Sequence, residues 1–269
     1  MAEMRFEGGF RGFTAESFGF FRELAENNNK PWFDLNRPRY DEHVAGAFRG
    51  LLAELEPSLL KLNPNFETAG KTNRNFSRIN RDIRFSRDKT PYKPNYYLYV
   101  FDRRGERGDV GRLYVGLSAD CVTVGFSIYG DGGRSDTSAL KTVFRKRLET
   151  HGALLQKLVG KILARRRYET YWHRQEKGEW TTHPGLPKRP EDWQTLQAWI
   201  VRKVFEPNAR SLASPAFAGE VLKIFRELYP VVVFTSVMSP RWQAELRVLS
   251  AILRKRQPGL RASATTVGL

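Results

Sequence analysis

Three strand-like runs stand close together in the middle of the chain, and they constrain the fold more than any other feature. They cover residues 96–101, 112–118 and 121–129, and each is rich in aromatic and β-branched residues. The connections between them, RRGERGDVG at 103–111 and SAD at 118–120, contain turn-forming residues. A parallel connection needs a crossover of about a dozen residues or more, so links this short predict an antiparallel sheet.

Segments with helical spacing lie on both sides of this β-rich part. Towards the N-terminus, apolar residues recur at helical spacing from Ala15, after the N-cap residue Thr14, and a longer second stripe ends at about Glu56. Towards the C-terminus, the same spacing covers residues 138–167 and 215–229. We therefore expect an α+β fold, in which a central antiparallel sheet is flanked by N-terminal and C-terminal helices.

Three further segments have patterns of their own. Residues 186–205, LPKRPEDWQTLQAWIVRKVF, predict a loop followed by a helix, and the aromatic alternation over 168–180 predicts one or two more strands. The run VVVFTSV at 231–237 fits a strand by its β-branched residues, and it fits a helix that restarts at Pro230 equally well. The sequence leaves these two alternatives open.

The sequence contains no linker that would separate two domains. A chain of 269 residues with a hydrophobic content of 41% can bury a sizeable core without disulfide bonds. We expect an irregular arm over residues 1–14, a single α+β domain over 15–254, and a mobile basic tail over 255–269.

The balance of charges is strongly basic. The chain has 45 lysines and arginines against 29 aspartates and glutamates, which gives a net charge of +16. Such a field attracts polyanions and phosphorylated ligands, although net charge alone does not identify a function. No stretch of membrane-spanning length is uniformly apolar, and the N-terminal residues lack the apolar core of a signal peptide. We expect a cytoplasmic protein without a membrane partner.

The chain lacks the residues and motifs that several common metal, catalytic and nucleotide-binding sites require. Cys121 is the single cysteine, so a cysteine zinc site or an intrachain disulfide is excluded, and the four histidines fall in four separate segments. The chain also lacks the GxSxG motif of a nucleophile elbow, a P-loop and a GxGxxG motif. The sequence therefore predicts no metal site built on cysteine or histidine and no cofactor, although carboxylates such as Asp82 or Asp88 could still hold Mg²⁺ through one or two contacts.

One segment stands out by its density of charges. Residues 78–95, RINRDIRFSRDKTPYKPN, alternate arginines, lysines and aspartates with a few apolar residues, and we call them the charged segment. An extended backbone would place Arg78, Asp82 and Arg84 on one face, and we favour it over a helix because turn-forming residues follow at 86–91. Arginine side chains bind phosphate or carboxylate groups through two parallel hydrogen bonds. The segment therefore predicts an anion-binding site.

The hypothesis assigns roles to particular residues and leaves three functions open. Asp82 and Asp88 orient the cations, or act as catalytic groups if the protein is an enzyme, which the sequence does not decide. The first expected ligand is one that bears a phosphate group. The alternatives are a nucleic-acid-binding module that uses the basic surface with Trp and Tyr rings, and a structural protein in which the charges form an internal salt-bridge network. The predicted ligand-binding residues are Arg78, Arg81, Arg84, Lys89, Tyr92, Lys93 and Trp32.

Two motifs together resemble a known family. NNNKPWFDLNRPRY, which begins at Asn27, and the later RINRDIRFSRDKTPYK are similar to the family of domain of unknown function 2461, which occurs in bacteria and fungi, and residues 186–205 look like its C-terminal signature. The resemblance spans about residues 18–229 and implies a cytoplasmic, single-domain protein without an established activity. The family motif falls on Trp32, Phe33, Arg78, Arg81, Asp82, Arg84, Phe85, Ser86, Asp88, Lys89, Pro91, Tyr92 and Lys93.

Overall fold

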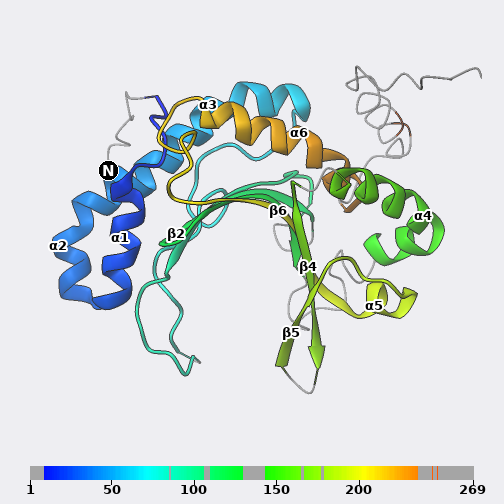
Figure 1. Ribbon diagram of the computed structural model, residues 1–269, viewed down its shortest axis with the longest axis horizontal. Coiled ribbons are helices and arrows are strands. Elements are labelled where there is room, and N and C mark those ends of the chain that lie inside the picture. Colours follow the sequence, from blue (N-terminus) through cyan, green and yellow to red (C-terminus); the bar gives the residue numbers. More distant parts are fainter. Residues whose placement is uncertain are drawn as a thin grey trace, which may run out of the picture.

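Strand pairing organises the fold. The computed structural model describes residues 9–84, 86–105, 110–129, 143–164, 167–176 and 179–235, together with residues 244 and 247. Within these residues, six strands form one fully antiparallel sheet in the order β1-β2-β3-β6-β4-β5 (Figure 1). The strands are β1 (Asn95–Val100), β2 (Arg112–Ser118), β3 (Val122–Tyr129), β4 (Glu169–Glu176), β5 (Glu179–Pro184) and β6 (Leu196–Phe205).

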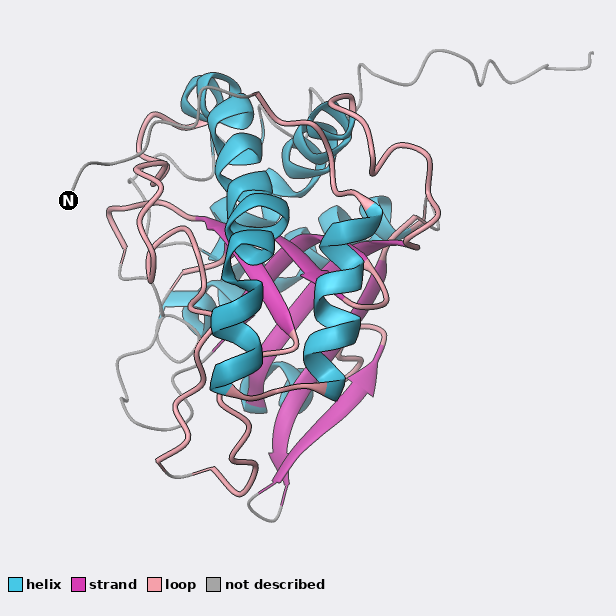
Figure 2. Cartoon of the chain, turned by 90° about the vertical axis from the view of Figure 1, so that its left-hand side faces the viewer, coloured by secondary structure: helices cyan, strands magenta, loops and turns pink. Residues whose placement is uncertain are grey.

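Helices cover one face of this sheet. In Figure 1, α3 and α6 lie across the upper side, and α6 packs against β2 and β3. Figure 2 shows α1 and α2 next to each other at one end of the molecule, and α4 packs against α6 at the other end. The helices are α1 (Ala15–Glu26), α2 (Lys30–Tyr40), the π-helical segment η1 (Asp41–Gly46), α3 (Ala47–Leu62), α4 (Val143–Leu163), α5 (Pro190–Thr195) and α6 (Phe217–Thr235).

The two faces of the sheet differ because side chains alternate along each strand. The face under the helices is largely apolar and buried, with Leu98, Val115, Phe126 and Trp199 among its side chains. The opposite face, which we call the open face, has its own small cluster made of strand residues alone. Its members are Tyr114, Ala198 and Ile200, with Tyr97, Tyr99, Tyr129 and Tyr171 packed around them.

The sheet and the α+β class expected from the sequence are confirmed, including the antiparallel order of β1 to β3. The aromatic stretch at 168–180 contributes to β4 and β5. Residues 231–235 continue α6, which decides the alternative left open by the sequence. The expected end of the second N-terminal stripe at Glu56 was wrong, because α3 continues through Pro57 to Leu62. Residues 130–142 and the basic tail at 255–269 lie outside the described residues.

The helix expected within residues 186–205 was also wrong. Only the short α5 is helical there, and β6 follows it directly. The physical reason is that β6 is a central strand with apolar residues on both faces: Ala198 and Ile200 belong to the open face, whereas Trp199 and Val201 pack under the helices. A run that is apolar on both sides loses the alternation that would identify a strand.

The charged segment is held at the edge of the sheet, and its described residues before β1, 78–84 and 86–94, form no regular strand or helix. Its extended pairing is confined to two short stretches, where the backbone N–H of Arg81 donates to the carbonyl of Pro91 at 2.8 Å and that of Lys93 to Ile79 at 2.8 Å. The Tyr92 ring stacks on Phe33 of α2 at a centroid distance of 4.0 Å. The Asn28 side chain donates to the carbonyl of Tyr92 and accepts from its N–H, both at 3.0 Å. An amide side chain and an aromatic stack therefore fix this segment to the N-terminal helices.

We predict that Asn28→Ala loosens the charged segment. The substitution leaves both backbone groups of Tyr92 without their side-chain partner, which should cost about 1–3 kcal/mol of the free energy of unfolding. Urea unfolding and the hydrogen exchange rate of the Tyr92 amide measure the two effects. Asn27→Ala is the matched control, because Asn27 donates only to the carbonyl of Glu23 at the end of α1. Unchanged exchange at Tyr92 in Asn28→Ala would contradict this role.

Candidate functional site

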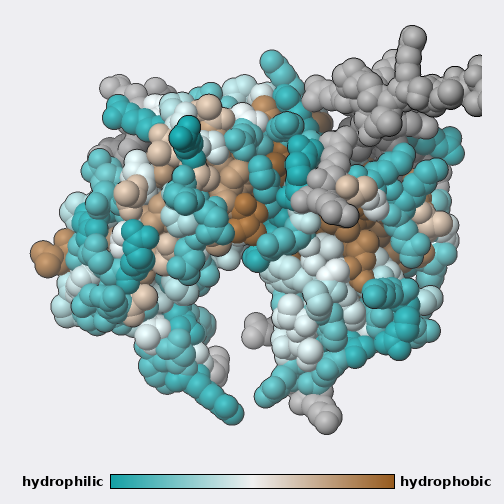
Figure 3. All heavy atoms as spheres, viewed as in Figure 1, coloured by the Kyte–Doolittle hydropathy of each residue, from teal (hydrophilic) through white to brown (hydrophobic). Residues whose placement is uncertain are grey.

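Cationic side chains gather in an open depression between the charged segment and the adjoining strands. The depression encloses about 770 Å³. We call it the basic depression, because five cations and one carboxylate line it together with Tyr99: Arg78, Arg81, Arg84, Lys93, Arg112 and Asp82. In Figure 3, the molecule is hollowed on this side, between the charged segment and the β4-β5 hairpin.

The basic depression brings together five of the nine residues predicted from the sequence: Arg78, Arg81, Arg84, Lys93 and Asp82. Asp88 and Lys89 lie beside it in the same segment, where the Lys89 ammonium donates to the carbonyl of Ile83 at 2.9 Å. The two predicted aromatic residues lie elsewhere, among the packed rings. Tyr92 is buried against Phe33, and Trp32 packs on Phe20 with ring centroids 5.6 Å apart.

The aspartates pair with arginines of the same segment. Asp82 accepts from Arg84 Nε at 2.9 Å and from Nη2 at 2.7 Å, and Asp88 forms an ion pair with Arg81. Asp88 also accepts from the backbone N–H and the hydroxyl of Thr90. These salt bridges join the charged segment to itself, whereas Asn28 and Tyr92 join it to the helices. The network expected as an alternative is therefore present locally, but these pairs are not what fastens the segment to its neighbours.

Both aspartates are held in their charged form. The side-chain hydrogen bond from Arg84 lowers the pKa of Asp82 to about 2, and the backbone hydrogen bond of Thr90 followed by the Arg81 side chain lowers the pKa of Asp88 to about 2. At neutral pH each carboxyl group is ionised, so it accepts hydrogen bonds and orients its arginine. A carboxyl group with such a pKa is a poor proton donor at neutral pH.

Two residues of the site, Tyr99 and Arg112, were missed in the sequence. The Arg112 guanidinium lies 4.0 Å from the ring centroid of Tyr99 and 5.4 Å from that of Tyr129, and its Nε donates to Ser127 Oγ at 3.3 Å. A cation over aromatic faces is attracted by their electron density, which fixes its position. The signal was present in the alternation of Tyr97 and Tyr99 along β1, but the antiparallel pairing had to be known before Arg112 could be placed beside them.

Four tyrosines of the open face, Tyr97, Tyr114, Tyr129 and Tyr171, stay neutral phenols at neutral pH. Burial raises the pKa of Tyr129 to about 12, with a further contribution from neighbouring Tyr171, and burial also raises the pKa of Tyr97, Tyr114 and Tyr171. The rings of Tyr97 and Tyr99 lie nearly parallel, at an interplanar angle of 15° and a centroid distance of 5.6 Å. The face beside the basic depression is therefore aromatic and able to form hydrogen bonds through its hydroxyl groups, and the cations Arg112 and Arg202 lie over its rings.

Two other features, a metal site and a membrane-spanning helix, are not found in the described part of the chain. No group of three or more histidine, cysteine, aspartate or glutamate side chains within it is placed to hold a metal ion. None of its helices is both long and apolar enough to cross a membrane.

The comparisons with known proteins identify the family. Residues 16–234 match the profile of the family described as conserved hypothetical protein, DUF2461, so the chain belongs to this family. The resemblance noted in the sequence is thereby confirmed, and that description assigns no activity. No curated protein matches the chain.

We predict that the two aspartates titrate independently of each other and far below their usual range. Their charged form is stabilised in the folded state, so the contribution to loop order is complete above the ordinary pKa of 3.8 and is lost as the pH falls towards about 2. Carbon NMR of the side-chain carboxyl groups measures both values. In Arg84→Ala, the pKa of Asp82 should rise towards 3.8 while that of Asp88 stays low. If the two values moved together, the separate ion pairs described above would be the wrong account.

Proposed function

We propose that the basic depression binds a phosphate-bearing ligand. The observation that carries the proposal is the convergence of five cationic side chains on one open depression that has a single carboxylate in its lining. Arginine offers a planar set of donors that matches two oxygens of a phosphate group at once. The proposal concerns binding and assigns no reaction to the protein.

Arg78 is the first residue that we assign to the ligand. Its side chain is exposed and lines the basic depression, and it makes neither a hydrogen bond nor an ion pair with any other described residue. Arg81 and Arg84, by contrast, already share their charge with Asp88 and Asp82. The guanidinium of Arg78 is thus the one whose donors are least committed to the protein.

Arg112 is the second residue that we assign to the ligand, for the opposite reason. Tyr99, Tyr129 and Ser127 hold its guanidinium in place, so little side-chain freedom is left to lose on binding. Groups that are fixed before the ligand arrives contribute more to affinity than mobile ones. A mobile arginine on the loop and a fixed one on the sheet would hold the phosphate group from two sides.

We predict that Arg78→Gln weakens the binding of pyrophosphate and ATP by about tenfold or more. A hydrogen bond to a charged group contributes about 1.5–3 kcal/mol, and about 1.4 kcal/mol corresponds to a factor of ten. Isothermal titration calorimetry at low salt measures the affinities. Arg87→Gln is the matched control, because Arg87 is an exposed arginine of the same segment that does not line the basic depression.

The two variants distinguish a specific binding site from a diffuse electrostatic attraction. Both remove one positive charge from the charged segment, so a diffuse electrostatic attraction would weaken equally in both. A specific site is weakened by Arg78→Gln alone. Equal losses, or no loss in either variant, would contradict the proposal.

Single-stranded nucleic acid is a second candidate ligand, favoured by the aromatic rings beside the basic depression. Tyr99 lines it, and Tyr97 continues the row of rings along β1. Bases stack on such side chains, with about 1–3 kcal/mol per base, while cations follow the phosphate backbone. The net charge of +16 supports this candidate through long-range attraction.

Salt dependence and Tyr99→Leu distinguish the two ligands. If nucleic acid is the ligand, the logarithm of the affinity for a short oligothymidylate should fall linearly and steeply with the logarithm of the salt concentration, because several counterions are released. Tyr99→Leu should then weaken the oligonucleotide more than pyrophosphate, because it removes a stacking surface in addition to one of the rings that hold Arg112. Fluorescence anisotropy measures the oligonucleotide. A flat salt titration would exclude this second candidate while leaving the phosphate proposal intact.

A further inference from the structure

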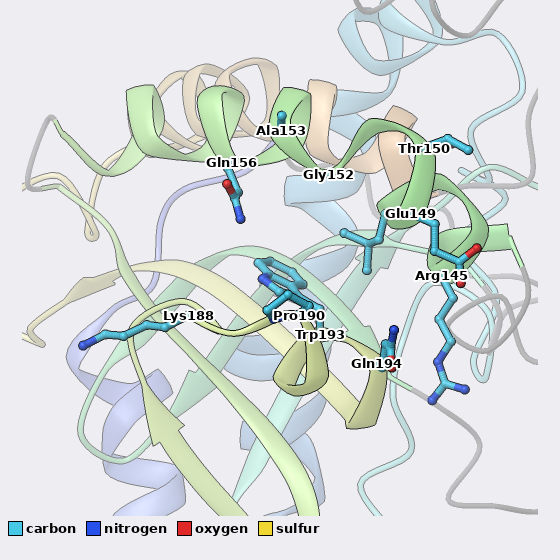
Figure 4. Close-up of a pocket in the computed structure, with 11 residues that line it drawn as sticks. Arg145, Glu149, Thr150, Gly152, Ala153, Gln156, Lys188, Pro190, Trp193 and Gln194 are labelled. Carbon is cyan, nitrogen blue, oxygen red and sulfur yellow. The ribbon is translucent and has the colours of Figure 1, made fainter.

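A second cavity, independent of the basic depression, lies between α4 and α5. It encloses about 620 Å³ and is lined by residues of α4, of α5 and of the segment that precedes α5 (Figure 4). This volume falls within the usual range of small-molecule sites, about 300–1,000 Å³. It shares no lining residue with the basic depression.

A break in α4 makes room for this cavity. His151 has a non-helical backbone conformation, with φ −140° and ψ 20°, and divides α4 into two parts. The two residues that follow it, Gly152 and Ala153, are small and line the cavity, and open space lies where a side chain of Gly152 would be. The roof of the cavity therefore carries little side-chain volume.

The floor is aromatic and apolar. Trp193 lines the cavity together with Leu148 and Pro190. Its indole is fixed edge-on against Trp199, with centroids 5.5 Å apart at 81°, and against Phe144. A rigid ring in a concave apolar wall is the kind of surface on which a flat ligand packs.

The same indole carries an unpaired donor. Trp193 is only 7% exposed, and its Nε1 has no hydrogen-bond partner within the described structure. A buried N–H without an acceptor is unfavourable, because it has lost water and gained nothing in return. Gln156 points from α4 towards the indole (Figure 4), so a movement of this side chain would let a ligand's acceptor approach the donor.

The polar groups at the rim favour an anion. Arg145 and Lys188 stand at the rim against one carboxylate, Glu149, and no described residue forms an ion pair with Arg145. Gln156 and Gln194 add amide groups that can donate or accept. An apolar floor with cations at its edge suits a molecule that is flat and apolar at one end and acidic at the other.

We propose that this cavity binds a small aromatic carboxylic acid. The ring of the acid packs on the apolar floor formed by Leu148, Pro190 and Trp193. Its carboxylate lies towards the rim, where Arg145 or Lys188 balances the charge. When Gln156 moves aside, one oxygen of this carboxylate accepts the hydrogen bond of Trp193 Nε1, and the other stays with the cation.

Naphthoate, with uncharged naphthamide as its partner, is the probe that tests this site on the full chain. Calorimetry should give saturable binding of naphthoate that is about tenfold tighter than that of naphthamide. Proton–nitrogen NMR should show a shift of the Trp193 indole N–H signal, which Trp193→Phe identifies by removing it. Equal affinity for the two probes, or an indole signal that does not move at saturation, overturns the proposal.

A substitution that fills the cavity tests whether naphthoate binds there. Ala153→Trp adds a large side chain to the roof at an exposed helical position and should abolish naphthoate binding. Ala164→Trp is the matched control, an exposed alanine after the C-terminus of α4 that does not line the cavity, and it should bind as the unaltered chain does. Undiminished binding by Ala153→Trp, with its fold verified by circular dichroism, would place the probe elsewhere. Arg78→Gln should leave naphthoate binding unchanged, so this inference stands or falls separately from the phosphate site.

Discussion

The structure depends on a sheet whose two faces meet different neighbours. Side chains alternate along every strand, so the strands that bury Leu98, Phe126 and Trp199 under the helices must present their remaining side chains on the other side. Tyrosine suits that second face, because its ring packs against neighbouring strands while its hydroxyl group tolerates water. The raised pKa of Tyr129 follows from the same packing. The aromatic open face and the apolar core under the helices therefore both follow from the same pairing of the strands.

The basic depression arises where this pairing ends. β1 is an edge strand of the sheet, and the chain beside it pairs only through isolated bridges such as Phe76 with Leu98, so this chain is free to leave the sheet as a charged loop. Asn75 is fully buried and fixes the point of departure by donating to the carbonyls of Glu67 and Tyr99. The loop pairs its two aspartates with Arg81 and Arg84. Its other cations exceed its carboxylates, and one of them, Arg78, lines the same depression as Arg112 of the sheet.

The sequence predicted the parts of this structure that depend on local pattern. β1 to β3 could be predicted because their links are too short for parallel crossovers, and Arg78 to Lys93 were recognised by their charges. β6 could not, because its apolar residues face both ways. Tyr92 was assigned to a ligand because its partners, Asn28 and Phe33, are distant in sequence. Arg112 was missed for the converse reason: it enters the site only through the register of β1 and β2. Local sequence patterns predict helices and strands. A binding site, by contrast, depends on which distant segments of the chain contact each other in the fold.

The exposure of the charged segment sets what kind of affinity its cations can provide. The Arg84 side chain is 76% exposed and that of Asp82 is 61% exposed, so water and salt screen their fields and each surface contact contributes little. The arginine on the sheet differs, because aromatic rings surround it and lower the local dielectric constant, which strengthens its attraction for an anion. Long-range attraction would then come from the paired cations of the loop and the net charge, and discrimination between anions from Arg78, Arg112 and Tyr99. A ligand selected in this way must offer both a phosphate group and a surface that fits the tyrosines.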